Sequence, residues 1–308
     1  MSATAPDARA AIEVEGLRKS YGSLEAVKGI GFHVDRGEVF ALLGPNGAGK
    51  TTTVEILEGY RRATAGRVRV LGHDPARHER ELRRRVGIVL QSTGVDPFLT
   101  VRETVELYAR YYPSPRNVDE VLAVVGLSEK RDTRVNKLSG GQQRRLDVAI
   151  ALAGDPELLF LDEPTTGFDP GARRNAWEIV RNLTALGKTV LLTTHYMDEA
   201  QNLANRVAVL SHGEIVAEGP PDTLAGRDRV HPRIRYRVPE GSPPLPEWGQ
   251  LHLGDGTYEL AAEDPTEMLH ELTGWALDRG VRFETIEVVR PSLEDVYLEL
   301  TGGEAGAE

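Results

Sequence analysis

Two patterns of apolar and polar residues alternate along most of the chain, one typical of buried strands and one typical of helices. Short, mostly apolar runs predict buried strands at residues 39–43, 86–91, 158–163 and 189–195. Segments between these runs carry apolar residues at spacings of three and four, which predicts helices. Because buried strands that alternate with helices form parallel sheets, the pattern predicts an α/β fold with a mostly parallel core sheet.

Two regions interrupt this alternation and predict additions to the core. Residues 12–17 and 26–34 alternate between apolar and polar side chains, so we expect an antiparallel β flap with a turn at residues 19–22. Residues from about 92 to 153 show helical periodicity, with two prolines between successive helices, which predicts a helical insertion.

The chain is expected to divide into two domains. Residues 227–246 are rich in Pro, Arg and Gly and predict a linker that contains one strand, 233–238. The elements expected after it are strands at 257–261 and 281–289, a helix that begins after Asp264, and a last helix from Pro291. Residues 227–308 would therefore form a linker and a small α+β accessory domain. Residues 11–226 would form the main domain, and residues 1–10, which are small and polar, a disordered N-terminus.

Composition limits the classes of protein that the chain can represent. It has 308 residues, of which 40% are hydrophobic, and no cysteine, which excludes disulfides, thiolate metal sites and cysteine nucleophiles. No apolar run approaches the about 20 residues that a membrane span needs, and the first residues lack the apolar segment of a signal peptide. We therefore expect a protein that is soluble or bound to a membrane only peripherally.

The net charge of −10 is concentrated at the end of the chain. Residues 229–308 contain 16 acidic and 7 basic side chains, whereas residues 1–228 contain 31 and 30. This asymmetry suggests a separate unit with its own surface, and it argues against a nucleic-acid partner for the tail.

The glycine-rich segment that follows the strand at 39–43 has the spacing of a phosphate-binding loop. Glycines let backbone N–H groups converge on phosphate oxygens, and the following helix N-terminus attracts the same anion. Lys50 would reach the β- and γ-phosphates, and the Thr51 hydroxyl would ligate Mg²⁺. The candidate nucleotide-binding residues of this loop are Gly44, Pro45, Asn46, Gly47, Ala48, Gly49, Lys50, Thr51 and Thr52.

Polar residues end three core strands and predict the chemistry beside this loop. Asp162 and Glu163 follow an apolar run, so both carboxylates are expected at the edge of the sheet that holds the loop. Asp162 is then placed to hold Mg²⁺, directly or through water, and Glu163 to polarise the water that attacks the γ-phosphate. Gln91 and His195 end two other strands; alone, each would more often be a surface residue, but together they favour a shared site.

A second candidate anion site begins a helix at Ser139, Gly140, Gly141 and Gln142. Alone, such a sequence is more often a structural helix cap. Because the chain has two phosphate-reading loops and one pair of catalytic carboxylates, we expect a dimer in which each Ser139 loop completes the partner's site. Tyr21 is expected either to stack on adenine or to pack within the fold, and Asp169 either to open a helix or to lie at an interface.

In this order, the phosphate loop, Gln91, the Ser139–Gln142 segment, Asp162-Glu163 and His195 resemble the ATP-binding-cassette (ABC) ATPases. The resemblance covers residues from about 12 to 225 and is specific, because the Ser-Gly-Gly-Gln signature is not a general feature of phosphate loops. It implies a P-loop ABC cassette and a head-to-tail homodimer that sandwiches ATP and Mg²⁺.

The resemblance also implies residue roles. Tyr21 would stack on adenine, and Gln91 would sense the γ-phosphate and Mg²⁺ and open the segment that faces a membrane partner. Glu163 would be the catalytic base, His195 would contact the γ-phosphate, and Asp169 would lie at the dimer interface. Phe168 stands where the family usually has Leu, which keeps an apolar side chain.

The tail at residues 290–297 looks like the C-terminal region of the daunorubicin-resistance-type ATPases, which pair with type-2 exporter permeases. It implies an exporter ATPase on the cytoplasmic face of the cell membrane, working through a separate permease. The alternatives are an importer ATPase with a regulatory tail and a non-transport machine of translation or chromosome maintenance. The latter is disfavoured by the single cassette, by the acidic tail and by the short stretch of 87 residues between Lys50 and Leu138. The sequence does not identify the cargo.

Overall fold

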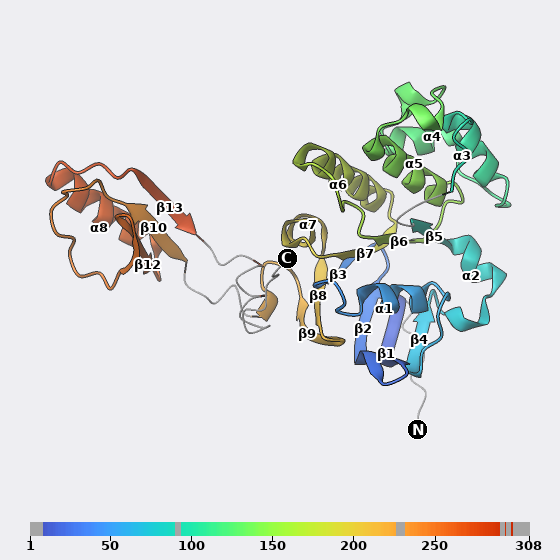
Figure 1. Cartoon of the computed structure of the whole chain (residues 1–308), viewed down its shortest axis with the longest axis horizontal. Coiled ribbons are helices and arrows are strands. Elements are labelled where there is room, and N and C mark those ends of the chain that lie inside the picture. Colours follow the sequence, from blue (N-terminus) through green and yellow to red (C-terminus); the bar gives the residue numbers. More distant parts are fainter. Residues whose placement is uncertain (1–8, 90–93, 226–231, 290–292, 294–296, 298–308) are drawn as a thin grey trace. The chain divides into compact units, whose positions relative to one another are not determined.

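The computed structural model describes residues 9–89, 94–225, 232–289, 293 and 297. The chain divides into two compact units, and the boundary in the sequence lies between Pro221 and Asp222. Figure 1 labels most of their helices and strands.

The first unit contains two sheets and a group of helices. Its strands are β1 (Ala10–Tyr21), β2 (Leu24–Asp35), β3 (Val39–Leu43), β4 (Ala65–Val70), β5 (Val86–Val89), β6 (Leu158–Asp162), β7 (Thr189–Thr194), β8 (Arg206–Ser211) and β9 (Glu214–Gly219). Its helices are α1 (Lys50–Leu57), α2 (Arg80–Arg85), α3 (Val101–Ala109), α4 (Val118–Val124), α5 (Gly140–Leu152), α6 (Pro170–Ala185) and α7 (Met197–Leu203), with short 3-10 helices at Pro75–Arg77, Ser128–Lys130 and Val135–Lys137.

The core sheet has the strand order β5-β6-β7-β3-β8-β9. Every neighbouring pair is parallel except β8 and β9, so the predicted α/β fold with a mostly parallel sheet is confirmed. All five residues of β3 are buried, as expected for a central parallel strand. Because β6, β7 and β3 are adjacent, the residues that follow their carboxyl ends meet at one edge of the sheet.

The antiparallel flap has the strand order β2-β1-β4. Its apolar residues pack with those of α1 and the core strands in one hydrophobic cluster. The predicted turn at residues 19–22 is wrong, because β1 continues to Tyr21, which pairs with Leu24, and the turn shrinks to Gly22 and Ser23. β1 also begins at Ala10, inside the segment that was expected to be disordered.

Helices α3, α4 and α5 pack on one another and fall within the predicted insertion (Figure 1). Each begins with a polar cap. Thr100 and Glu103 form a capping box on α3, Asn117 caps α4, and Ser139 and Gln142 form a capping box on α5.

The second unit is a small α+β fold. Its elements are β10 (Arg233–Arg237), β11 (Leu251–Gly254), β12 (Thr257–Ala261), α8 (Pro265–Asp278) and β13 (Thr285–Val289), with strand order β11-β12-β10-β13. Ile234, Tyr236, Leu260 and Leu272 form the centre of its core, and Asp264 caps α8 as predicted. The sequence missed β11 because three of its four residues are exposed, and β13 begins four residues later than expected. The predicted last helix lies outside the described residues except for Leu293 and Tyr297.

Candidate nucleotide site

The segment between β3 and α1 requires glycine at two positions. A Cβ on Gly44 would clash with the carbonyl oxygen of Leu210. Gly49 has φ of +104°, and a Cβ there would lie 2.6 Å from the carbonyl oxygen of Ala26. The backbone of this loop is therefore held against two neighbouring strands, in a shape that other residues cannot adopt.

The N-terminus of α1 is open toward the loop. Its N-cap is Gly49, and no side chain bonds to the first N–H groups, which leaves them available to an anion. Thr51 is exposed in the first turn, whereas Thr53 is buried and its hydroxyl donates to the Gly49 carbonyl at 2.9 Å. A cavity of about 140 Å³ lies here, lined by the loop residues and by Glu163.

Lys50 is buried and directed into the loop. Its Nζ donates to the carbonyl oxygens of Gly44 at 2.7 Å and Pro45 at 3.1 Å, and lies 3.4 Å from Oε1 of Glu163. Burial lowers the pKa of Lys50, partly offset by the carboxylates of Glu163 and Asp162. A buried ammonium of this kind gains free energy from an anionic ligand that replaces the carbonyl contacts.

The two carboxylates at the end of β6 are fixed by its neighbour β7. The Thr193 hydroxyl donates to Oδ1 of Asp162 at 2.5 Å and accepts the backbone N–H of Glu163 at 2.9 Å. The backbone of Glu163 has φ of +44°, a left-handed conformation that is uncommon for a residue with a side chain. The chain therefore turns sharply where the second carboxylate begins.

The carboxylate of Glu163 contacts three other side chains of the site. Its Oε1 lies 3.4 Å from Nζ of Lys50 and 3.5 Å from Nδ1 of His195, and its Oε2 accepts from the Thr166 hydroxyl at 3.1 Å. Burial raises the pKa of Glu163, but Lys50, His195 and Thr166 together outweigh it, so the net pKa lies below the ordinary value. The carboxyl is thus ionised at neutral pH and can accept a proton.

His195 approaches Glu163 from the end of β7. Its Nδ1 is buried and has no hydrogen-bond partner among the described residues, since the contact with Glu163 lacks hydrogen-bond geometry. The centre of its ring lies 4.0 Å from that of Tyr196, with the two rings tilted by 41°, and the Arg173 guanidinium lies over the Tyr196 ring at 4.1 Å. A polar atom is therefore available beside the carboxylate.

The Ser139–Gln142 segment and Asp169 both cap helices. The Ser139 hydroxyl accepts the Gln142 N–H at 3.3 Å, and Asp169 accepts the N–H groups of Gly171 and Ala172. The backbone bonds from Ala172 and Gly171 lower the pKa of Asp169. Both segments therefore act as helix caps within this chain, and their roles in ligand binding and at a dimer interface stay predictions.

Tyr21 ends β1 with a partly exposed ring. Lys19 Nζ lies 4.9 Å and the Arg61 guanidinium 5.5 Å from the ring centre. Gln91 lies outside the described residues, so its role stays a prediction.

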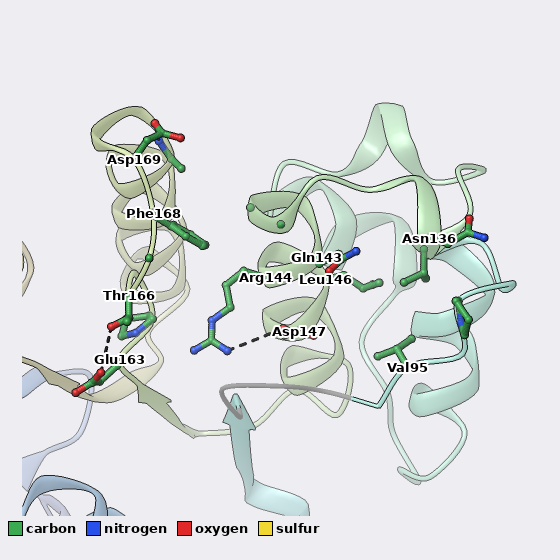
Figure 2. Close-up of a pocket in the computed structure, with 17 residues that line it drawn as sticks. Val95, Asn136, Gln143, Arg144, Leu146, Asp147, Glu163, Thr166, Phe168 and Asp169 are labelled. Carbon is green, nitrogen blue, oxygen red and sulfur yellow. Dashed lines mark hydrogen bonds and ion pairs between the residues drawn. The ribbon is translucent and has the colours of Figure 1, made fainter.

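A larger cavity of about 780 Å³ lies between α5 and the segment from Glu163 to Ala172 (Figure 2). Figure 2 shows Arg144 extending from α5 into this space, and Glu163 lies at the cavity's edge next to the core strands. The cavity therefore lies on the side of Glu163 that faces the helices, whereas the smaller cavity lies in the phosphate loop.

Sequence reasoning missed two residues that hold the site together, Thr193 and Arg144. The two threonines that interrupt the apolar run of β7 just before His195 were a usable signal for Thr193. Nothing in the sequence distinguishes Arg144 from Arg145, because the two are consecutive arginines of the same helix.

Comparison with known protein families identifies both units. Residues 27–166 match the family model described as ABC transporter, and residues 232–292 match the model of an ABC transporter domain-containing protein-like C-terminal domain. Among solved structures, the chain resembles CbiO1 of Clostridium perfringens, part of the ABC transporter complex CbiONQ, with a TM-score of 0.63, 30% identity, and coverage of 70% of this chain and 90% of that one. It also resembles a dimeric ATP-binding cassette bound to ADP and phosphate, with a TM-score of 0.59, 28% identity, and coverage of 68% and 98%.

Two curated relatives match nearly the whole chain. The Nod factor export ATP-binding protein I of Paraburkholderia xenovorans is 48% identical and covers 96% of this chain and 98% of the relative. The daunorubicin resistance ATP-binding protein DrrA2 of Streptomyces coeruleorubidus is 40% identical, with 95% of each chain covered. Because the phosphate loop, the carboxylates at the strand edge and these full-length matches agree, the chain belongs to the ATP-binding subunits of ABC transporters and is an ATPase.

Proposed function

We propose that this ATPase is the motor subunit of an exporter and that its own residues divide the work of binding and hydrolysing ATP. The observation that carries the proposal is the position of Glu163, an ionised carboxylate within 3.5 Å of both Lys50 and His195 at the edge of the phosphate-loop cavity. A base, a cation and a polar histidine next to an anion-binding loop are the parts that phosphoryl transfer to water requires.

Binding begins at the phosphate loop. The N–H groups in the first turn of α1, which no side chain caps, would hold the phosphates. Lys50 would exchange its contacts with two carbonyl oxygens for the β- and γ-phosphate oxygens. Tyr21 would stack on the adenine ring, consistent with its partly exposed face.

The donor set near the loop fits Mg²⁺. Thr51 offers an exposed hydroxyl, and Asp162 offers a carboxylate that the Thr193 hydroxyl orients through Oδ1. Among the described residues no group of three or more His, Cys, Asp or Glu side chains could hold a metal ion. A site with few protein ligands suits Mg²⁺, which keeps waters and phosphate oxygens in its shell. Gln91 would add an amide oxygen, and the bound ion would neutralise phosphate charge.

Glu163 would act as the general base. Its carboxylate accepts a proton from the attacking water, while its contact with Lys50 keeps it ionised. His195 would bond to the γ-phosphate through the ring edge that faces Glu163. The hydrogen bond from the Thr166 hydroxyl limits the rotation of the carboxyl group, which favours one direction of attack.

A second copy of the chain would complete the site. Ser139, Gly140 and Gly141 lie at an exposed helix N-terminus, where they could meet the γ-phosphate held by a partner. Asp169 would lie at the same interface. A dimeric cassette among the related structures supports this arrangement.

Export is supported by relatives named for Nod factor export and daunorubicin resistance. No helix in the described part of the chain is long and apolar enough to cross a membrane. We infer that a separate type-2 permease provides the path and places the ATPase on the cytoplasmic face of the cell membrane. Co-purification of that permease with the full-length chain tests this step, and a partner related to importers would refute it.

The role of Glu163 is tested by Glu163→Gln. We expect the variant to bind ATP as tightly as the wild type and to lose ATP turnover at least about 100-fold, because the base is removed while the shape is kept. Glu157→Gln is the matched control, since this carboxylate precedes β6 at the other end of the strand and pairs with Arg36 and Arg85. Normal turnover by Glu163→Gln would refute the assignment.

The shared site is tested by mixing two inactive variants, Ser139→Arg and Glu163→Gln. A mixed dimer contains one intact site, because the wild-type Glu163 of one chain faces the wild-type Ser139 of the other. Random pairing then predicts recovery of about a quarter of the wild-type turnover. No recovery in a mixture shown to exchange subunits would contradict a dimer with shared sites.

A further inference from the structure

The peptide bond between Asp162 and Glu163 is held at both ends by side chains. On one side, Nη2 of Arg144 donates to the Asp162 carbonyl oxygen at 3.0 Å. On the other side, the Glu163 N–H donates to the Thr193 hydroxyl at 2.9 Å. Neither bond belongs to a helix or to the sheet ladder, so the orientation of this one peptide depends on two side chains from different elements.

This peptide needs such support because of the conformation that follows it. Glu163 has φ of +44°, a left-handed conformation that is strained for a residue with a side chain. A rotated peptide would relieve this strain and would carry the Glu163 carboxyl away from Lys50 and His195. The two bonds therefore oppose a relaxation that would dismantle the site.

The side chain of Arg144 is mostly buried and lies beside an acidic residue of the same helix. Its side chain is 12% exposed, and Asp147, one turn along α5, lies 3.9 Å from Nη1. Burial lowers the pKa of Arg144, and the charges of Asp147, Asp162 and Glu199 oppose this effect. Figure 2 shows the guanidinium reaching from α5 across the larger cavity toward the segment of Glu163. An arginine guanidinium stays charged in proteins even when its pKa is lowered, so its hydrogen bond to the Asp162 carbonyl oxygen is charge-assisted.

We propose that Arg144 is a positioning residue for Glu163: it holds the Asp162–Glu163 peptide in the orientation that points the carboxylate at the nucleotide site. Arg144 also lies on the helix that begins at Gly140, next to Ser139, so one side chain connects the helix expected to face a partner's nucleotide with the base of its own site. The proposal rests on the function proposed above for Glu163.

The same helix provides a matched control. Arg145 is the next residue, is likewise partly buried, and also donates to a backbone carbonyl, that of Gly126 at 3.3 Å. Its bond lies in the helical group and touches no residue of the nucleotide site. A general loss of helix stability would therefore follow from either substitution, whereas loss of peptide orientation would follow only from a change at Arg144.

The experiment measures ATP turnover, the KM for ATP and the melting temperature of the full-length chain with Arg144→Met, Arg144→Lys and Arg145→Met. We expect kcat to fall about 10- to 100-fold in Arg144→Met, because small displacements of a catalytic group have effects of this size. Arg144→Lys should lie between Arg144→Met and the wild type, since it keeps one charged donor. The KM should change less than about twofold, because Arg144 does not line the phosphate-loop cavity.

The outcomes distinguish a positioning role of Arg144 from a general loss of stability and from failure of the role proposed for Glu163. A kcat of Arg144→Met within about twofold of the wild type, or an equal loss in Arg145→Met, would overturn the proposal. If Arg144→Met does not fold, Arg144→Lys decides: reduced kcat with an unchanged melting temperature supports positioning, and unchanged kcat refutes it. Glu163→Gln is assayed alongside; if it keeps turnover, the proposed function itself fails, and if only the Arg144 variants behave as wild type, the positioning role alone fails.

Discussion

The substitution Thr193→Val isolates the other support of the Asp162–Glu163 turn. Thr193 is fully buried, and its hydroxyl makes two bonds: it accepts the Glu163 N–H at 2.9 Å and donates to the Asp162 carboxylate at 2.5 Å. Valine keeps the shape but offers neither bond. The Glu163 N–H is then left without its partner, and the Asp162 carboxylate loses a donor.

The expected cost follows from these two bonds. A buried N–H without a partner costs about 1–3 kcal/mol, and a hydrogen bond to a charged group contributes about 1.5–3 kcal/mol. Burial of the methyl group that replaces the hydroxyl offsets about 1 kcal/mol of this cost. We therefore expect the free energy of unfolding of the first unit to fall by about 1.5–5 kcal/mol.

Urea denaturation without nucleotide measures this change. Trp177 lies in α6 of the first unit, whereas Trp248 and Trp275 lie in the second. Replacing the latter two by Phe leaves Trp177 as the single fluorescent probe of the unit that holds the site. Linear extrapolation of its transition then gives the free energy of unfolding.

Thr104→Val is the matched control. Thr104 is also fully buried, but its hydroxyl donates only to the Thr100 carbonyl at 2.8 Å, within the first turn of α3. This local bond adds little to stability, so the control should lose less than about 1 kcal/mol. If Thr193→Val costs no more than Thr104→Val, the two bonds do not stabilise the turn and the reasoning is wrong.

Three further predictions concern other parts of the chain. Burial, together with the carboxylates of Asp162 and Glu55, raises the pKa of Glu58 from 4.5 to about 8. The folded state therefore binds this proton more tightly than the unfolded state does. As the pH rises from 4.5 to about 8, the free energy of unfolding should fall by up to about 1.4 kcal/mol per pH unit. Glu58→Gln should flatten this slope in urea titrations at several pH values without Mg²⁺, and an unchanged slope would contradict the assignment. Gly49→Ala should abolish ATP binding, measured with a fluorescent ATP analogue, because the new Cβ would lie 2.6 Å from a carbonyl oxygen; wild-type affinity would show that the loop adapts. Leu272→Ala should destabilise the second unit by about 2–5 kcal/mol, because Leu272 is fully buried in its core, and a smaller loss in calorimetry would mean that the cavity collapses.

Most of the helices and strands, and much of the chemistry, could be predicted from the amino-acid sequence. Unbroken apolar runs mark the central strands because a parallel strand is buried on both faces, and the glycine spacing marks the phosphate loop because its backbone excludes side chains. Asp162, Glu163 and His195 could be placed at strand ends for the same reason. Edge elements such as β11 escaped, since an exposed strand has no pattern of burial to read.

The way in which these segments come together could be read only from the folded chain. Residues 44, 162 and 194 are distant in sequence, and they come together because β3, β7 and β6 are neighbours in the sheet. Local periodicity carries no information about the lateral order of strands. Nor could it distinguish Arg144, which bonds to the Asp162 carbonyl, from Arg145, which bonds to Gly126, because both are arginines of one helix and only packing gives each its direction.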